Sequence, residues 1–239
     1  MKKRIGALFC ALLAMAALTL SFALPASAAD DDDTIVIQVY FYDADGNMIE
    51  KDPIYGMALP LGYNMTHAQS AFDDVEHMQL FLQAARAEVR LFADVSTALT
   101  VPAGTTATLN LNGFALSAAG NTAPLTVAAG GALTVTDTSA DKSGSIAYTG
   151  SAAISAVENH GRLTIETANV TTASSAALIA NSGETARIAV KGGNFDTNGA
   201  GNFANGAGAR IAVSGGSFTE ASPEAYERLI LDVLLGEPP

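Results

Sequence analysis

Cysteine is nearly absent from this sequence, and tryptophan is absent altogether. The single cysteine, Cys10, lies in an apolar stretch near the start of the chain. This scarcity excludes a disulfide framework and a zinc site built on several cysteine thiolates. Burial of apolar side chains and pairing of backbone groups must therefore stabilise the fold.

The first 28 residues have the pattern of a secretory signal peptide. Residues 1–4 are basic apart from the initiator methionine, residues 5–24 are apolar, and Ala26 and Ala28 form a small-x-small ending. We expect cleavage after Ala28. An uncleaved anchor is the alternative, because residues 5–24 are long enough to span a bilayer. No second long apolar segment follows, so the expected location is outside the cell, either free or loosely held at the surface.

Basic residues are also scarce, with 12 Lys and Arg against 24 Asp and Glu and a net charge of −12. Three of the basic residues lie in the signal segment, so its removal leaves a net charge of about −15. Nucleic acids and anionic membranes both bind basic surfaces. The balance therefore predicts neither as a partner. The lack of a second long apolar segment predicts no membrane span after cleavage.

The region before residue 91 divides into two segments. Residues 29–65 contain an acidic start, a strong strand at 34–42, a turn at 43–47 and a returning strand from Met48, which together predict a β-hairpin followed by a loop. Residues 66–90 contain apolar side chains at helical spacing between Thr66 and Arg86. We expect one helix there, packed across the end of the following repeats.

A three-run unit recurs from residue 91 to residue 220. Each unit has short apolar runs separated by Gly, Pro or Asn, which are strand and turn signals. The middle runs begin at steps of 24, 30, 25 and 23 residues, and the third runs follow similar steps; the long step reflects a polar insertion at 137–144. The landmarks are Leu109, Leu133, Leu163, Ile188 and Ile211 for the middle runs, and Phe114, Ile146, Val170, Phe195 and Phe218 for the third.

A period of this length indicates a solenoid. Three strands per turn predict a parallel β-helix of about five coils, since each coil buries its apolar face only by stacking on its neighbours. A leucine-rich repeat would need a fixed leucine and asparagine pattern that is absent. Open ends of such a stack expose strand edges. The helix at 66–86 and a second predicted helix in residues 221–239, opened by Ser222-Pro223-Glu224, are candidate covers.

The repeat region resembles that of secreted, adhesin-like bacterial surface proteins with pectate-lyase-like right-handed parallel β-helices. The residues that carry the resemblance are 91–95, 99–104 and 109–113, with Gly-Gly-Asn-Phe at 192–195 and Gly-Gly-Ser-Phe at 215–218. The resemblance covers about residues 66–224. It implies a right-handed coil and export. Proteins of this kind serve as adhesins, autotransporter passengers, polysaccharide lyases or structural stalks.

One candidate ligand-contact site is a column of arginines. Arg162, Arg187 and Arg210 each precede a middle strand at steps of 25 and 23 residues, so they are expected to stack on consecutive coils. Such a column could bind an acidic sugar or another carboxylate through paired N–H groups. The alternative is an outward, salt-bridged surface, with Glu166, Glu184 and Asp196 as neighbours. Asn159, Asn181 and Asn205 recur in the corresponding turns and predict a structural amide ladder.

No catalytic, metal-binding or cofactor-binding constellation is predicted. Asp137 and Asp141 lie in the insertion, Asp196 lies two coils away, and His67 and His77 are ten residues apart. We therefore expect a non-enzymatic protein that binds a glycan or another cell-surface partner. A polysaccharide lyase or glycoside hydrolase is the second hypothesis, and would need converging carboxylates. A structural stalk or protein-binding subunit is the third.

Overall fold

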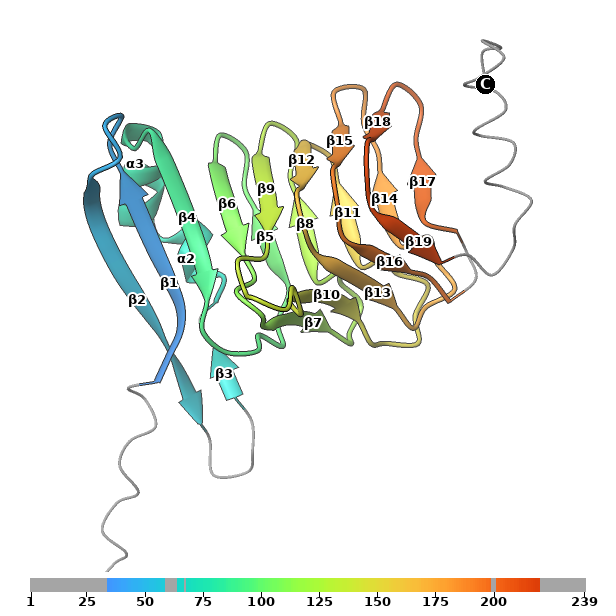
Figure 1. The fold of residues 1–239 in the computed structure, drawn as a ribbon, viewed down its shortest axis with the longest axis horizontal. Helices are drawn as coiled ribbons and strands as arrows, with labels where there is room; N and C mark the ends of the chain where they lie inside the picture. Colours follow the sequence, from blue (N-terminus) through green and yellow to red (C-terminus); the bar gives the residue numbers. More distant parts are fainter. Residues whose placement is uncertain (1–33, 59–63, 67, 199–200, 220–239) are drawn as a thin grey trace, which may run out of the picture.

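A computed structural model describes residues 34–58, 64–66, 68–198 and 201–219. It confirms the predicted parallel β-helix of three-strand coils (Figure 1). The predicted signal peptide and the predicted C-terminal helix in residues 221–239 lie outside the described residues. In the part of the chain that the structure describes, no helix is long and apolar enough to cross a membrane.

Three sheets form the walls of the coil. The nine-stranded sheet has the order β18 (Arg210–Val213), β15 (Arg187–Val190), β12 (Arg162–Ile165), β9 (Ala132–Thr136), β6 (Thr106–Asn110), β4 (Arg86–Leu91), β1 (Thr34–Tyr42), β2 (Met48–Ala58) and β3 (Asn64–Thr66). The second sheet has the order β19 (Ser217–Thr219), β16 (Asn194–Asp196), β13 (Asn169–Thr172), β10 (Ser145–Tyr148) and β7 (Ala115–Ala118). The third sheet has the order β17 (Phe203–Asn205), β14 (Ile179–Asn181), β11 (Val157–Asn159), β8 (Leu125–Val127) and β5 (Leu99–Val101).

The observed register corrects two landmarks of the first coil. Ala107, not Leu109, pairs with Leu133, and Leu116, not Phe114, pairs with Ile146. Each predicted landmark lies two residues away from the observed one. A slip of two residues keeps the same side chains facing inward, so the apolar pattern alone could not detect it. From the second coil onward, the predicted middle and third landmarks pair with one another as expected.

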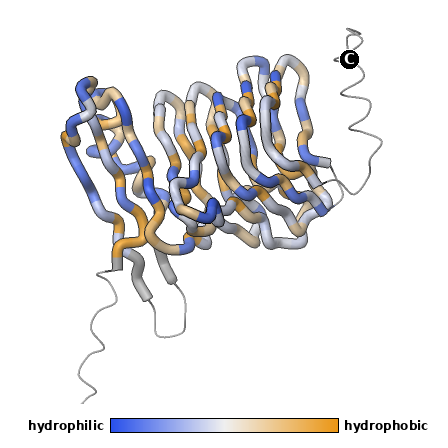
Figure 2. The backbone as a smooth tube through the Cα atoms, in the orientation of Figure 1, coloured by the Kyte–Doolittle hydropathy of each residue, from blue (hydrophilic) through white to orange (hydrophobic). Residues whose placement is uncertain are grey.

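Alternating side chains build the core of the coil. The burial of β9, β12 and β15 alternates residue by residue, with Leu133, Leu163 and Ile188 facing inward in one row. Figure 2 shows the corresponding alternation of hydrophobic and hydrophilic residues along the strands. Stacked inward rows of this kind give each coil its apolar contacts from the coils above and below it.

The predicted helix over residues 66–86 is wrong in its extent. The structure has two short helices, α2 (Ser70–Asp73) and α3 (Val75–Gln83), with Thr66 in β3 and Arg86 at the start of β4. Asp74 separates the helices because its backbone is extended and its carboxylate accepts hydrogen bonds from the N–H groups of Glu76 and His77. Beyond α3, residues 86–91 alternate between exposed or half-buried and buried side chains, which is the strand period.

The first coil is closed by specific contacts. Phe81 of α3 packs against Phe41 of β1 and against Phe72 of α2, with ring centroids 5.0 and 6.2 Å apart. The side-chain amide of Gln69 bonds both the N–H and the carbonyl of Thr100 at 2.7 and 2.8 Å, covering the edge of β5. Val95 bridges to β7 at the edge of the second sheet. These contacts protect edges that would otherwise pair with other chains.

β1 connects the predicted hairpin to the coil. It pairs antiparallel with β2 on one side and with β4 on the other, and β4 continues in parallel to β6. The turn at 43–47 is closed by Asp43, whose carboxylate accepts the N–H groups of Asp45 and Asn47. The hairpin is thus a continuation of the nine-stranded sheet and not a separate unit.

Candidate functional site

The nine-stranded sheet is the widest of the three sheets in the described residues, and we call its solvent-facing side the outer face. Cross-strand neighbours point to the same side of a sheet, so the register places its side chains in rows. One row crosses the middle of the strands: Lys51, Tyr40, Glu88, Thr108, Thr134, Thr164 and Ala189. A second row lies beside it: Thr106, Ala132, Arg162, Arg187 and Arg210.

At the β1 end, the outer face carries a tyrosine–cation cluster, which consists of Tyr40, Tyr42, Lys51, Arg86 and Arg90. The guanidinium of Arg86 lies 4.1 Å from the ring centroid of Tyr42, and that of Arg90 lies 5.1 Å from the centroid of Tyr40. Lys51 Nζ lies 5.9 Å from the same Tyr40 ring. Because β2 and β4 flank β1, Tyr40 stands between Lys51 and Arg90. The rings therefore hold cations in place through cation–π attraction.

Glu88 fixes the orientation of Arg90 in this cluster. Glu88 Oε1 accepts hydrogen bonds from Arg90 Nε at 2.8 Å and from Asn110 Nδ2 at 2.8 Å, and lies 2.7 Å from Arg90 Nη2. Partial burial alone would lower the pKa of the Arg90 guanidinium, but the bonds and charge of Glu88 raise it above its ordinary value. Arg90 is thus a fixed cation whose side chain is 32% exposed.

Tyr40 is also fixed. Its hydroxyl donates to Oε1 of Gln38 at 2.7 Å, and the ring lies 6.4 Å from that of Tyr42, nearly parallel to it. Partial burial raises the pKa of the Tyr40 hydroxyl, and the nearby charge of Arg90 offsets this only in part. The hydroxyl therefore stays a protonated donor at neutral pH.

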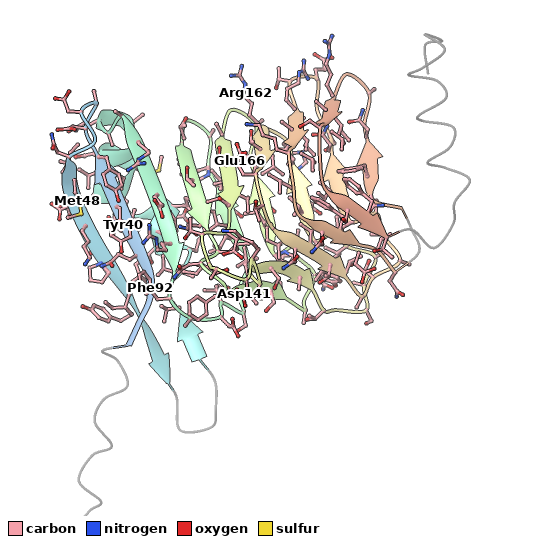
Figure 3. The ribbon with its side chains drawn as sticks, in the orientation of Figure 1. Tyr40, Met48, Phe92, Asp141, Arg162 and Glu166 are labelled. Carbon is pink, nitrogen blue, oxygen red and sulfur yellow. The ribbon has the colours of Figure 1, made fainter. Side chains whose placement is uncertain are left out.

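The predicted arginine column is present in register on β12, β15 and β18, where Arg162 pairs with Arg187 and Arg187 with Arg210. Arg162 and Arg210 are exposed, and Arg187 is half-buried. Arg187 Nη1 donates to the carbonyls of Glu184, Ala186 and Gly208 at 3.1, 2.7 and 3.2 Å. Figure 3 shows Arg162 extending away from the end of β12.

The predicted carboxylate neighbours do not neutralise this column within the described residues. Glu166 pairs instead with Lys191, with Nζ and Oε1 2.8 Å apart. Asp196 lies on β16 of the second sheet, and Glu184 contributes its backbone carbonyl to Arg187. The salt-bridged alternative is therefore not what the described residues show, and the side chains of Arg162 and Arg210 are exposed.

The three asparagines form a hydrogen-bonded ladder along the third sheet. They are the last residues of β11, β14 and β17, and not turn residues as predicted. Asn159 Nδ2 donates to Asn181 Oδ1, and Asn181 Nδ2 donates to Asn205 Oδ1, both at 2.8 Å. Asn159 and Asn181 are fully buried. Their amides join successive coils.

The inserted loop at 137–144 is ordered around one carboxylate. Asp137 is buried and accepts hydrogen bonds from the N–H groups of Gly113, Ser139 and Gly144. Desolvation alone would raise the pKa of Asp137, but these bonds lower it below its ordinary value. Asp141 is exposed and bonds Ser143. Within the described ranges, no three His, Cys, Asp or Glu side chains are placed to hold a metal ion.

Sequence reasoning missed the tyrosine–cation cluster. Its signal was the alternation of Tyr40 with Tyr42 and of Arg86, Glu88 and Arg90, which marks one face of two strands. The predicted helix ended at Arg86, so β4 was not recognised as the partner of β1. Comparisons with protein-family models, curated proteins and solved structures give no match.

Proposed function

We propose that this chain is a secreted, non-enzymatic β-helix protein that binds a glycan on the outer face, in the manner of a surface adhesin. The observation that carries the proposal is the tyrosine–cation cluster, in which Tyr40 and Tyr42 hold Lys51, Arg86 and Arg90 on a flat sheet surface. Fixed donors lose little conformational entropy when a ligand binds, so they favour affinity.

The centre of the outer face supports the same proposal. Thr108, Thr134 and Thr164 follow one another across β6, β9 and β12, and each is half-buried. Their hydroxyls both donate and accept hydrogen bonds, which matches the hydroxyl groups of a sugar chain. The row continues the line that starts at Tyr40, so an extended glycan could contact both regions.

Binding without turnover is supported by the two carboxylates of this face. Glu88 is held by Arg90, and Glu166 by Lys191. Their strands, β4 and β12, are three strand spacings apart, or about 14 Å. Glycosidase carboxyl pairs are at most about 9.5 Å apart. The secreted location in the proposal is supported by the signal-peptide pattern of residues 1–28.

The experiment is a glycan-binding measurement on the chain from residue 29 onward. Replacing Tyr40→Ala and Tyr42→Ala together should weaken glycan binding about tenfold or more, since central tyrosines commonly contribute over 1 kcal/mol each to recognition. Leu82→Ala is the matched control, because Leu82 is an exposed apolar residue of α3, on the other side of the sheet. Binding unchanged in the double variant, or hydrolysis of the glycan, would contradict the proposal.

A further inference from the structure

The basic residues of this acidic chain are concentrated on one surface. The described part of the chain contains eight Lys and Arg residues. Seven of them lie on the outer face, on its strands or directly after one: Lys51, Arg86, Arg90, Arg162, Arg187, Lys191 and Arg210. The eighth, Lys142, lies in the inserted loop and donates to the carbonyl of Asp137.

Acidic residues are nearly excluded from the same surface. Of the fifteen Asp and Glu residues in the described ranges, only Glu88 and Glu166 lie on the outer face. Asp52 is on β2 but points to the inner side, where its carboxylate lies 2.7 Å from His77 Nε2 of α3. The outer face is thus locally positive on a molecule with a net charge of −12.

We infer that the ligand of the outer face is an acidic polysaccharide, bearing carboxylate or sulfate groups, that lies across the strands. This inference rests on the proposed function and names its ligand class. The cations are placed at both ends of the face: the tyrosine–cation cluster spans β2, β1 and β4, and the arginine column spans β12, β15 and β18. The two groups are joined by the threonine row.

The dimensions suit a polymer better than a single sugar. From β2 to β18 there are seven strand spacings, or about 34 Å. A ligand that contacts cations at both ends gains from linked binding events, since the second contact is intramolecular. Arg187 is already tied to three backbone carbonyls, so the column presents one braced guanidinium between two open ones, Arg162 and Arg210.

The same geometry argues against a nucleic acid as the ligand. Single-stranded nucleic acids bind by stacking bases on open aromatic faces. Here Tyr40 is flanked by Lys51 and Arg90, and Tyr42 is covered by Arg86, so those ring faces are occupied by cations.

The test uses two matched polymer pairs, dextran with dextran sulfate and hyaluronate with its methyl ester, together with single-stranded DNA. At least one acidic polymer should bind the chain about tenfold or more tightly than its neutral counterpart. Binding should weaken strongly at about 1 M salt, where charges are screened beyond about 3 Å.

The double variant Arg162→Gln with Arg210→Gln should lose about tenfold in affinity for the acidic polymer. Lys142→Gln removes the same kind of charge away from the outer face and should leave binding unchanged.

The outcomes separate this inference from the proposed function. Equal binding of neutral and acidic polymers overturns the inference and leaves glycan binding intact. If none of the four polysaccharides binds, the proposed function and the inference both fail. If single-stranded DNA binds as tightly as the acidic polysaccharide, the inference that the ligand is a polysaccharide and not a nucleic acid is overturned. If Lys142→Gln weakens binding of the acidic polymer as much as the double arginine variant does, net charge alone, and not the outer face, drives binding.

Discussion

Single buried polar side chains join segments of this protein that are far apart in the sequence. Asn181 connects three coils, because it accepts from Asn159 and donates to Asn205 and to the carbonyl of Arg210. Asp137 connects the inserted loop to the turn at Gly113. Buried polar groups of this kind cost free energy when a partner is removed, so they are where single substitutions should have the largest effects.

Replacing Asn181→Ala should lower the free energy of unfolding by about 1–3 kcal/mol, since the Asn159 and Asn205 amides each lose a buried or partly buried partner. Urea unfolding of the purified chain measures this change. Asn205→Ala is the matched control, because Asn205 is the exposed last member of the ladder. Asn205→Ala should lower the free energy of unfolding by clearly less than Asn181→Ala does. Equal losses in both variants would show that the ladder is not a cumulative structural element.

Asp137→Asn should destabilise the protein at neutral pH and much less in acid. The folded-state pKa of Asp137 lies below 3.8, so its contribution is fully present above the unfolded value and is lost as the pH falls through the folded value. At pH 7 the loss should be about 1–3 kcal/mol, because one of three N–H donors would face an amide donor. Urea unfolding should show a smaller difference in free energy of unfolding between the variant and the unsubstituted chain at about pH 3 than at pH 7. A difference in free energy of unfolding that is the same at both pH values would contradict this role of the Asp137 carboxylate.

At the scale of elements, the coils stack so closely that some corners admit only glycine. A Cβ atom added at Gly161 would lie 2.4 Å from the carbonyl oxygen of Gly131 and 2.5 Å from that of Ala128. Neither neighbour is a side chain that could rotate away. The turn at Gly161, between the third sheet and the nine-stranded sheet, is therefore packed backbone against backbone.

Gly161→Ala should reduce the free energy of unfolding by about 1–3 kcal/mol or more, as overpacking of a rigid site does. Gly120→Ala is the control, since a Cβ atom there meets nothing within 4 Å. It should change stability by less than about 0.5 kcal/mol. Thermal or urea unfolding of the two variants makes the comparison, and a neutral Gly161→Ala would mean that the coils can separate locally without cost.

The sequence predicted the coil because its evidence is repeated, whereas the elements before it occur once. Five units predicted the strand order, and the two misplaced strand landmarks, such as Leu109 for Ala107, were shifts that leave the inward face unchanged. In residues 66–91 no repeat was present to correct the helix signal. Asp74 ended α2 by capping α3, and Arg86 opened a strand whose pairing with β1 is a long-range contact.

The candidate site was predictable only where it is periodic. Arg162, Arg187 and Arg210 share the repeat spacing, so the sequence placed them in one column. Tyr40 and Arg90 come from an antiparallel strand pair that lies outside the repeat. No sequence spacing relates them, so their contact could be seen only once β4 was placed beside β1.

At the scale of the whole molecule, charge is divided between surfaces. An acidic chain presents seven of its eight described basic residues on one sheet face, and the hairpin before the coil extends that face by two strands, β1 and β2. The β-helix supplies the arginine column, and the single N-terminal cluster adds cations that lie against tyrosine rings. The outer face is therefore built jointly by the repeats and by the hairpin that precedes them.

The measurement that tests this account most directly is an NMR titration of the isotope-labelled chain with the acidic polysaccharide that binds it. We predict that the perturbed amide and arginine side-chain signals cluster on the outer face, from Tyr40 and Arg90 through Thr134 to Arg162 and Arg210. Signals of the second and third sheets should stay unchanged. Perturbations centred instead on the polar hollow around Thr171, Asp196 and Asn198 of the second sheet would contradict the assignment of the outer face as the binding surface.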